Sequence, residues 1–264
     1  RDLYGPRESA RLLSYIATAM ALAPALAPML GGYMTVWLGW QSIFLFLAGY
    51  ALIGGLLLQT RIAETAPVDG RSRSGLRNLP ANYARLLRHR NWRWYTLACS
   101  FVFAGLFAFL SGSSFVIIGF LGYGEEQFGL FFALIVVGFM AGTLVAGRMV
   151  QRVGIDALIL CGALLATLGG CVMLTLSVAG IHSVWAIVLP HMVYMMGTGM
   201  VMPQAMAGAL TPFPQIAGTS SALLGFIQML LAALAGTLVG HYHDGGPLAM
   251  SAAICLMGLL TLVS

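Results

Sequence analysis

Long apolar segments separated by short polar ones are the main feature of this chain. No charged residue occurs between Arg11 and Arg61, or between Asp156 and Asp244. A helix of about 20 apolar residues crosses the hydrocarbon of a bilayer and satisfies its own backbone hydrogen bonds there. The pattern therefore predicts an all-α integral membrane protein.

Turn residues divide the apolar stretches into eight expected helices. Gly180–Ser183 and Thr211–Pro214, for example, split the charge-free stretch after residue 156 into three crossings. Each segment is long enough, or nearly so, to cross a bilayer. The eight expected spans are 12–36, 43–58, 94–120, 128–147, 157–179, 184–206, 217–240 and 247–264.

Charge predicts how these spans are oriented. All 13 basic residues are arginines, and they fall only within residues 1–11, 61–93 and 148–152. These segments flank alternate spans, so they lie on one side of the membrane, which the positive-inside rule identifies as the cytoplasm. Eight spans that begin in the cytoplasm also end there.

Composition agrees with a helical bundle in lipid. The chain is 59% hydrophobic and 8% charged and contains 33 glycines, and small residues let membrane helices approach closely. The net charge of +5 belongs to the arginine-bearing loops and requires no nucleic acid as a partner. The four cysteines lie in apolar segments without CxxC spacing, which favours reduced thiols over disulfides or a zinc site.

Enzyme chemistry is not expected. The sequence contains neither an HExxH nor a GxSxG motif. His241, His243 and Asp244 are close in sequence, but two imidazoles and a carboxylate in a loop are more often simply polar than a metal site. We therefore expect no catalytic residue and no bound metal.

The longest polar connection, 59–93, divides the chain into three parts. Residues 82–90 have the pattern of a short amphipathic helix on the lipid headgroups, anchored by Trp92, Trp94 and Tyr95. The connection is either a solvated linker between two bundles, which we favour, or a lipid-regulatory site. The expected organisation is the end of one bundle at 1–58, a basic cytoplasmic loop at 59–93, and a second bundle at 94–264.

Two regions carry a family resemblance. They are residues 1–44, with Met20-Ala-Leu-Ala-Pro-Ala-Leu-Ala-Pro-Met-Leu-Gly-Gly32, and residues 200–230, with Met202-Pro-Gln-Ala-Met-Ala-Gly-Ala-Leu210. Both resemble the major facilitator superfamily and, within it, the bicyclomycin-resistance (Bcr/CflA) drug-efflux family. The resemblance implies a six-plus-six helical transporter, of which the chain would hold helices 5 to 12 and lack the first four.

The same resemblance implies a function. It implies proton-coupled export of small amphipathic, drug-like compounds across the bacterial inner membrane by alternating access of two bundles. The implied partners are the substrate, protons and membrane lipids, the implied state is a monomer, and the proton gradient takes the place of a cofactor. The alternatives are a solute importer or uniporter of the same fold, and a non-transporting membrane scaffold or receptor.

One motif resembles the antiporter motif of the superfamily's fifth helix. It comprises Pro24, Ala27, Pro28, Gly31 and Gly32, with alanine at 27 where the family has glycine. Prolines bend a helix and glycines let a partner helix approach. The segment is therefore either an antiporter seal, which we favour, or an ordinary kinked packing helix.

A second motif, at 147–154, resembles the superfamily's cytoplasmic turn. Gly147, Arg148, Arg152 and Gly154 match that pattern, but Gln151 stands where the family has an acidic residue. An arginine here can interact with a helix end, and the last glycine can close the turn.

Polar and aromatic residues at helical spacing identify candidate substrate contacts. Methionine and aromatic side chains adapt to ligands of varied shape, although for any single residue helix packing is an equally good interpretation. The predicted substrate-binding residues are Ile16, Met20, Ala23, Phe103, Phe107, Ser111, His191, Tyr194, Thr198 and Gln228.

His191 is the only one of these residues that titrates near neutral pH. An imidazole inside a span costs free energy unless it is paired or hydrated, so His191 is either a cavity residue or a satisfied core histidine. No Asp, Glu or Arg lies deep in the eight spans. The proton-binding carboxylate of such an antiporter is therefore expected in the missing front helices rather than at His191.

Overall fold

The computed structural model describes residue 27 and residues 30–61, 79–242 and 245–264. Over these ranges the chain is helical and contains no β-strand. Among the residues that the structure describes, six helices are long and apolar enough to cross a membrane, and a shorter apolar helix follows at 248–263. The predicted all-α membrane class is confirmed. The described residues form two parts, 30–61 with 125–133, and 79–124 with the residues from 134 onward.

The first part contains α2, Gln41–Arg61, preceded by helical residues 30–38. Gly39 separates the two helices with a φ of 80°, a conformation that glycine adopts at little cost. The Ser42 hydroxyl then donates a hydrogen bond to the Gly39 carbonyl oxygen at 2.7 Å. The expected span 43–58 lies within α2, whereas most of the expected span 12–36 lies outside the described residues.

The second part begins with α3, Leu79–Arg88, which is the amphipathic helix expected near 82–90. Leu86 is buried on one face, whereas the neighbouring Leu87 is exposed. The next helix follows directly because the His89 side chain caps it, accepting a hydrogen bond from the Trp92 amide at 3.2 Å.

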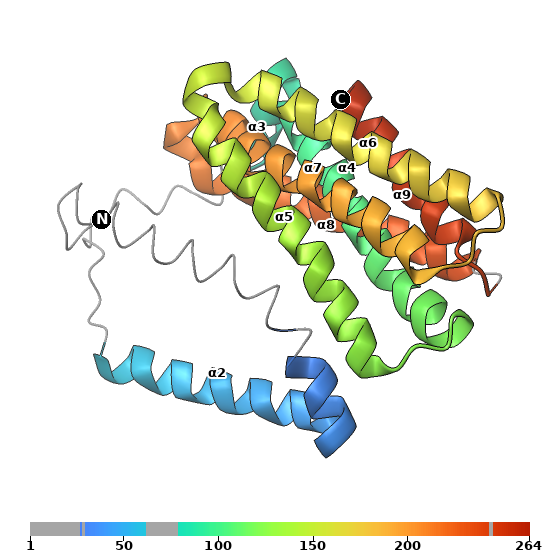
Figure 1. Ribbon diagram of the computed structural model, residues 1–264. Coiled ribbons are helices and arrows are strands. Elements are labelled where there is room, and N and C mark those ends of the chain that lie inside the picture. The colour runs from blue at the N-terminus through green and yellow to red at the C-terminus, as the bar shows by residue number, and fades with distance from the viewer. Residues whose placement is uncertain (1–26, 28–29, 62–78, 243–244) are drawn as a thin grey trace. The chain divides into compact units, whose positions relative to one another are not determined.

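The remaining helices follow the expected spans closely, and Figure 1 shows them side by side. A π-helical segment, η3, ends the first of them, and a 3-10 turn, η4, precedes α8. The bounds are α4 Arg90–Ser114, η3 Phe115–Phe120, α5 Glu125–Val153, α6 Ile155–Val178, α7 Val184–Leu210, η4 Pro214–Ile216, α8 Ala217–His241 and α9 Leu248–Val263.

The main correction concerns the predicted turn at 147–154. α5 continues through residue 153, so Gly147, Arg148 and Arg152 are helical, and all three are exposed. Only Gly154 makes the turn into α6, with a φ of 84°. The helix ends there because a left-handed residue terminates it, and nothing between 148 and 153 blocks helical geometry.

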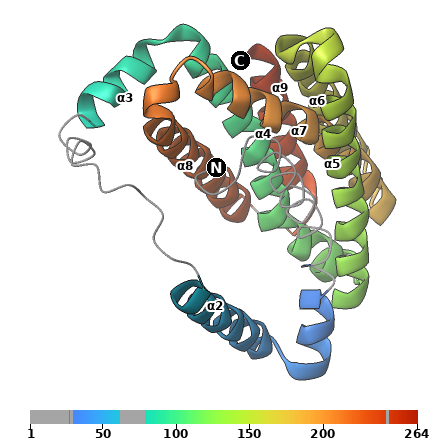
Figure 2. The same ribbon diagram turned by 90° about the vertical axis from the view of Figure 1, so that its left-hand side faces the viewer.

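α7 is the most buried of the apolar helices, with 67% of its apolar centre inside the structure. It packs against α6 and α4 (Figure 2). Glycines make the α6 crossing close, because a Cβ atom at Gly162 would lie 2.8 Å from the carbonyl oxygen of Gly197, and one at Gly197 would clash with Gly162. Lipid tails are as apolar as leucine, so moving a leucine from lipid to a helix interface gains little hydrophobic free energy. Membrane helices therefore depend on small residues that allow close packing.

α6 and α9 also pack closely, through small polar side chains. The Thr167 hydroxyl donates to the Gly258 carbonyl oxygen at 2.9 Å, and the Ser177 and Ser251 hydroxyls are 2.7 Å apart. Between these contacts, the sulfur atoms of Cys171 and Cys255 lie 3.5 Å apart as free thiols. All four cysteines are free thiols in the structure, and Cys161 is exposed rather than buried.

Candidate functional site

The predicted residues on α4 form a half-buried aromatic and polar surface. The rings of Phe103 and Phe107 pack together with their centroids 4.9 Å apart, and both side chains are half-buried. Ser111 lies two turns from Phe103 and is also half-buried. A Cβ atom at Gly236 of α8 would lie 2.6 Å from the Ser111 hydroxyl oxygen, so this part of the α4 surface faces α8.

Gln228 lies on α8, the helix that packs against α4. Its side chain is 8% exposed, and its neighbours in sequence, Ile227 and Met229, are more exposed. The amide therefore lies on the inner side of α8. An amide in this position can donate and accept hydrogen bonds to a polar ligand without a formal charge.

The predicted residues on α7 are completely buried in the helical bundle. The imidazole of His191 stacks on Phe109 of α4 at 3.9 Å between ring centroids, and Tyr194 stacks near it at 5.5 Å. The Tyr194 hydroxyl donates to the Val102 carbonyl oxygen at 3.1 Å, and Thr198 bonds within its own helix. These contacts make this face of α7 part of the packed interior in this conformation.

His191 differs from its neighbours in its hydrogen bonding. Neither ring nitrogen has a hydrogen-bond partner in the described structure. The prediction allowed a cavity residue or a satisfied core histidine, and the structure shows a core histidine held by ring stacking alone. The spacing of polar and aromatic residues along α7 could not distinguish these cases. Such residues recur with the same helical period whether they face a packed interior or a cavity.

The remaining predicted residues belong to the N-terminal region. Ile16, Met20, Ala23, Pro24 and Pro28 lie outside the described residues, and Ala27 is described as exposed and helical. Gly31 and Gly32 are helical, but a Cβ atom at Gly31 would meet nothing within 4 Å, and one at Gly32 would lie 3.4 Å from the carbonyl oxygen of Glu125. A tight helix crossing at these glycines is therefore absent from the described part of the chain.

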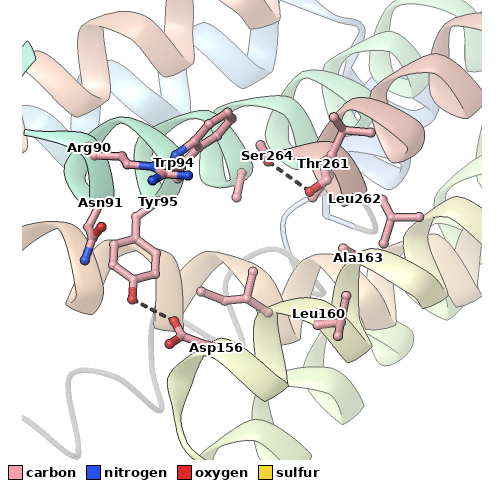
Figure 3. Close-up of a pocket in the computed structure, with 13 residues that line it drawn as sticks. Arg90, Asn91, Trp94, Tyr95, Asp156, Leu160, Ala163, Thr261, Leu262 and Ser264 are labelled. Carbon is pink, nitrogen blue, oxygen red and sulfur yellow. Dashed lines mark hydrogen bonds between the residues drawn. The ribbon is translucent and has the colours of Figure 1, made fainter.

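A cavity in the second part was not predicted from the sequence. It has a volume of about 500 Å³ and lies between the starts of α4 and α6 and the end of α9 (Figure 3). The Tyr95 hydroxyl donates to the Asp156 carboxylate across it at 2.7 Å. Its lining residues are Arg90, Asn91, Trp94, Tyr95, Ala98, Asp156, Ile159, Leu160, Ala163, Thr261, Leu262, Val263 and Ser264.

A smaller cavity of about 370 Å³ lies where α3 meets the α7–α8 turn. Arg85 lies over the ring of Phe213, 5.7 Å from its centroid, and the His89 ring meets the same phenyl ring edge-on at 5.1 Å. These contacts hold α3 against the end of the bundle. The predicted transport residues line neither of the two cavities.

The long apolar helices and their glycine crossings define a multi-pass helical membrane protein. The chain belongs to the Major Facilitator Superfamily, whose model matches residues 1–263. The superfamily resemblance seen in the sequence and the expected fold are confirmed. The members are transporters rather than enzymes.

Curated relatives agree with this family. The chain is 27% identical to a bicyclomycin resistance protein homolog of Haemophilus influenzae, with 97% of the chain and 65% of the relative aligned. It is 28% identical to Multidrug resistance protein D of Escherichia coli, covering 98% and 64%. It is 26% identical to a chloramphenicol resistance protein of Pseudomonas aeruginosa, covering 90% and 56%. The chain thus spans less than two thirds of the length of these relatives.

A solved structure supports the fold independently. The bacterial homologue of the iron transporter ferroportin, in its inward-facing state, superposes with a TM-score of 0.65 over 99% of this chain and 64% of that chain. The two sequences are only 13% identical, so the similarity concerns the helical architecture.

Proposed function

We propose that this chain is part of a drug-efflux transporter of the bacterial inner membrane. Its partners would be small amphipathic compounds exported by alternating access. The observation that carries the proposal is the family match over residues 1–263, together with relatives named for resistance to bicyclomycin, to chloramphenicol and to multiple drugs.

The half-buried surface of α4 and the buried amide of Gln228 on α8 support this proposal. Phe103 and Phe107 offer an adaptable aromatic surface, Ser111 offers a hydroxyl on the same helix, and Gln228 offers an amide on the inner side of α8, which packs against α4. A mainly apolar surface with few polar groups suits compounds of varied shape. We assign substrate contact to these four residues and a packing role to the buried residues of α7.

Gln228→Leu tests this assignment in the full-length protein. Loss of the amide should lower resistance to drugs that hydrogen-bond to it, whereas resistance to purely apolar drugs should change little. We expect the ratio of the two resistances to fall by about tenfold. The measurement is the ranking of resistance to a panel of polar and apolar drugs in a drug-sensitive bacterial strain. Gln204→Leu is the matched control, because Gln204 has the same exposed fraction as Gln228 but lies on α7 rather than on α8. An unchanged ranking in Gln228→Leu would remove Gln228 from the site.

We further propose that export is driven by exchange for protons. Within the described spans the acidic residues lie only near helix starts, at Glu125, Glu126 and Asp156, and His191 is enclosed by aromatic rings. Both observations agree with a proton-binding carboxylate outside this chain. The substrate-coupled proton would then never bind in the bundle formed by α4 to α9.

The antiporter motif is tested by Gly32→Leu in the full-length, reconstituted protein. A leucine would force apart any helix that packs on Gly32 during the transport cycle. Substrate binding should stay within a few-fold, because the substrate-contacting residues are unchanged, while efflux against a proton gradient should fall at least about tenfold. Wild-type coupled efflux in this variant would leave an importer or an ordinary packing helix as the better account of the motif.

A further inference from the structure

Two cysteines from different helices meet where α6 crosses α9. The sulfur atoms of Cys171 and Cys255 lie 3.5 Å apart, and both thiols are free. The two helices approach closely at this point, because a Cβ atom at Gly170 would lie 2.8 Å from the Cα atom of Cys255. The crossing therefore makes neighbours of two thiols that are 84 positions apart in the sequence.

Hydrogen bonds between α6 and α9 fix the crossing on both sides of the two thiols. On one side the Thr167 hydroxyl donates to the Gly258 carbonyl oxygen at 2.9 Å. On the other side the Ser177 and Ser251 hydroxyls are 2.7 Å apart. These contacts hold the two helices in register, so the proximity of the sulfur atoms does not depend on a bond between the thiols themselves.

The surroundings of the two thiols are apolar. No charged residue lies in α6 after its first turn or anywhere in α9. The next residue along each helix, Val172 and Leu256, is exposed on the surface of the bundle, whereas Cys171 is half-buried and Cys255 is buried. A charged ligand would lose its hydration here without gaining a counter-ion. The crossing therefore suits a neutral, lipid-soluble compound.

The number and spacing of the sulfur atoms select the kind of atom that can bridge them. Among the described residues, no group of three or more His, Cys, Asp or Glu side chains could hold a metal ion, whereas a structural zinc ion takes four ligands. With bonds of about 2.3 Å to sulfur, a linear two-coordinate ion holds its sulfurs about 4.6 Å apart, and a bridging atom with a bond angle of about 100° holds them about 3.5 Å apart. The observed 3.5 Å fits the bent geometry.

We propose that Cys171 and Cys255 form a dithiol site that captures monosubstituted trivalent arsenicals, neutral compounds of the type R–As=O. Trivalent arsenic is a soft, pyramidal centre that favours sulfur, and it needs only two thiols when an organic group occupies its third position. Each sulfur forms a bond to arsenic, the two S–H protons leave with the oxygen atom as water, and no oxidation state changes. The product is neutral and bridges α6 to α9.

This inference is independent of the proposed efflux activity, because it uses neither the substrate-contacting residues nor the antiporter motif. It is tested with phenylarsine oxide on full-length protein purified in detergent without added oxidant. Excess glutathione, a monothiol, then removes any arsenical that is held by a single cysteine. Native mass spectrometry should show one phenylarsine group retained by the wild type, and the dithiol 2,3-dimercaptopropanol should remove it.

Single substitutions identify the two thiols. Cys171→Ser and Cys255→Ser each leave one thiol and keep a small side chain. The second arsenic–sulfur bond forms within one molecule, so losing it should weaken binding of phenylarsine oxide by at least about 100-fold. Cys161→Ser is the matched control, because Cys161 is an exposed thiol on the same helix as Cys171, and it should retain the arsenical like the wild type.

Three results would overturn the proposal. The first is equal retention by the wild type and by either Cys171→Ser or Cys255→Ser, and the second is an adduct that glutathione alone removes from the wild type. The third is recovery of a disulfide between these two cysteines from the purified protein, because the site requires two thiols. Unfolding the wild type before labelling separates the thiols and should abolish glutathione-resistant binding. Persistence of that binding would also overturn the proposal, and this measurement needs no variant that folds.

Discussion

α2 and α7 are both long apolar helices, yet they are buried to very different extents. None of the apolar centre of α2 is buried, whereas 67% of that of α7 is. Both contain glycines, but a Cβ atom at Gly54 or Gly55 of α2 would meet nothing within 4 Å. In α7, a Cβ atom at Gly197 or Gly199 would clash with the backbone of a neighbouring helix.

The difference teaches that apolarity and packing are separate properties of a membrane helix. Apolarity is needed to enter the bilayer, but close packing requires a partner helix with small residues at the matching height. α7 has such partners in α5 and α6, which bring Gly142 and Gly162 to it. α2 has none among the described residues of its own part.

The largest predicted effect comes from filling the α6–α7 crossing. Gly197→Leu places a side chain where the backbone of Gly162 and Ala166 already lies. Helix backbone cannot move aside to relieve the clash, whereas a flexible side chain could change its rotamer. We expect destabilisation of about 3 kcal/mol or more, measured as a loss of folded protein and a lower midpoint of thermal unfolding in detergent.

Gly54→Leu is the control for that experiment. The same substitution in α2 meets open space and should leave the unfolding midpoint unchanged. If both variants were equally stable, the close packing of α7 would not contribute to stability. If both unfolded, α2 would have a tight partner that the described residues do not include.

A smaller effect is expected where α3 docks on the bundle. Leu86→Ala removes a completely buried side chain and should cost about 2 kcal/mol, at the lower end for such truncations because the site lies at the edge of the bundle. Leu87→Ala, at an exposed neighbour, should cost less than about 0.5 kcal/mol. Equal effects on the unfolding midpoint would show that α3 is not docked through Leu86.

Much of the fold could be predicted because membrane insertion leaves a clear one-dimensional signal. Charge-free runs and turn residues located the helices from α4 to α9, and the amphipathic pattern of residues 82–90 located α3. The end of α5 was predicted too early because Gly147 suggested a turn. Of the two glycines Gly147 and Gly154, only Gly154 adopts a positive φ.

The candidate site was harder to predict than the fold. In lipid, an outward leucine such as Leu160 and a buried one such as Leu158 have the same sequence signature, since the surrounding solvent is itself apolar. The cavity beside Tyr95 joins residues from three distant segments, and the partner of Tyr95 is 61 positions away. Periodicity within one helix carries no information about such contacts.

The smallest predicted effect concerns His191, which tests whether α7 packs or takes part in coupling. His191→Phe keeps a ring to stack between Phe109 and Tyr194 and removes two buried nitrogens that lack partners. Replacing such a group by an apolar one of similar shape is nearly neutral, so stability should change by less than about 1 kcal/mol. Tyr194→Phe provides the contrast, because it leaves the Val102 carbonyl oxygen without its side-chain donor and should cost about 1 kcal/mol.

The same His191 variant separates packing from proton transfer in the full-length protein. Phenylalanine cannot bind a proton, so substrate-induced proton release should persist at the wild-type level if the coupling carboxylate lies elsewhere. The measurement is proton release on substrate addition to detergent-solubilised protein, alongside equilibrium substrate binding. Loss of proton release with intact binding would move the coupling site to α7, and the buried face of this helix would then have to open to water during transport.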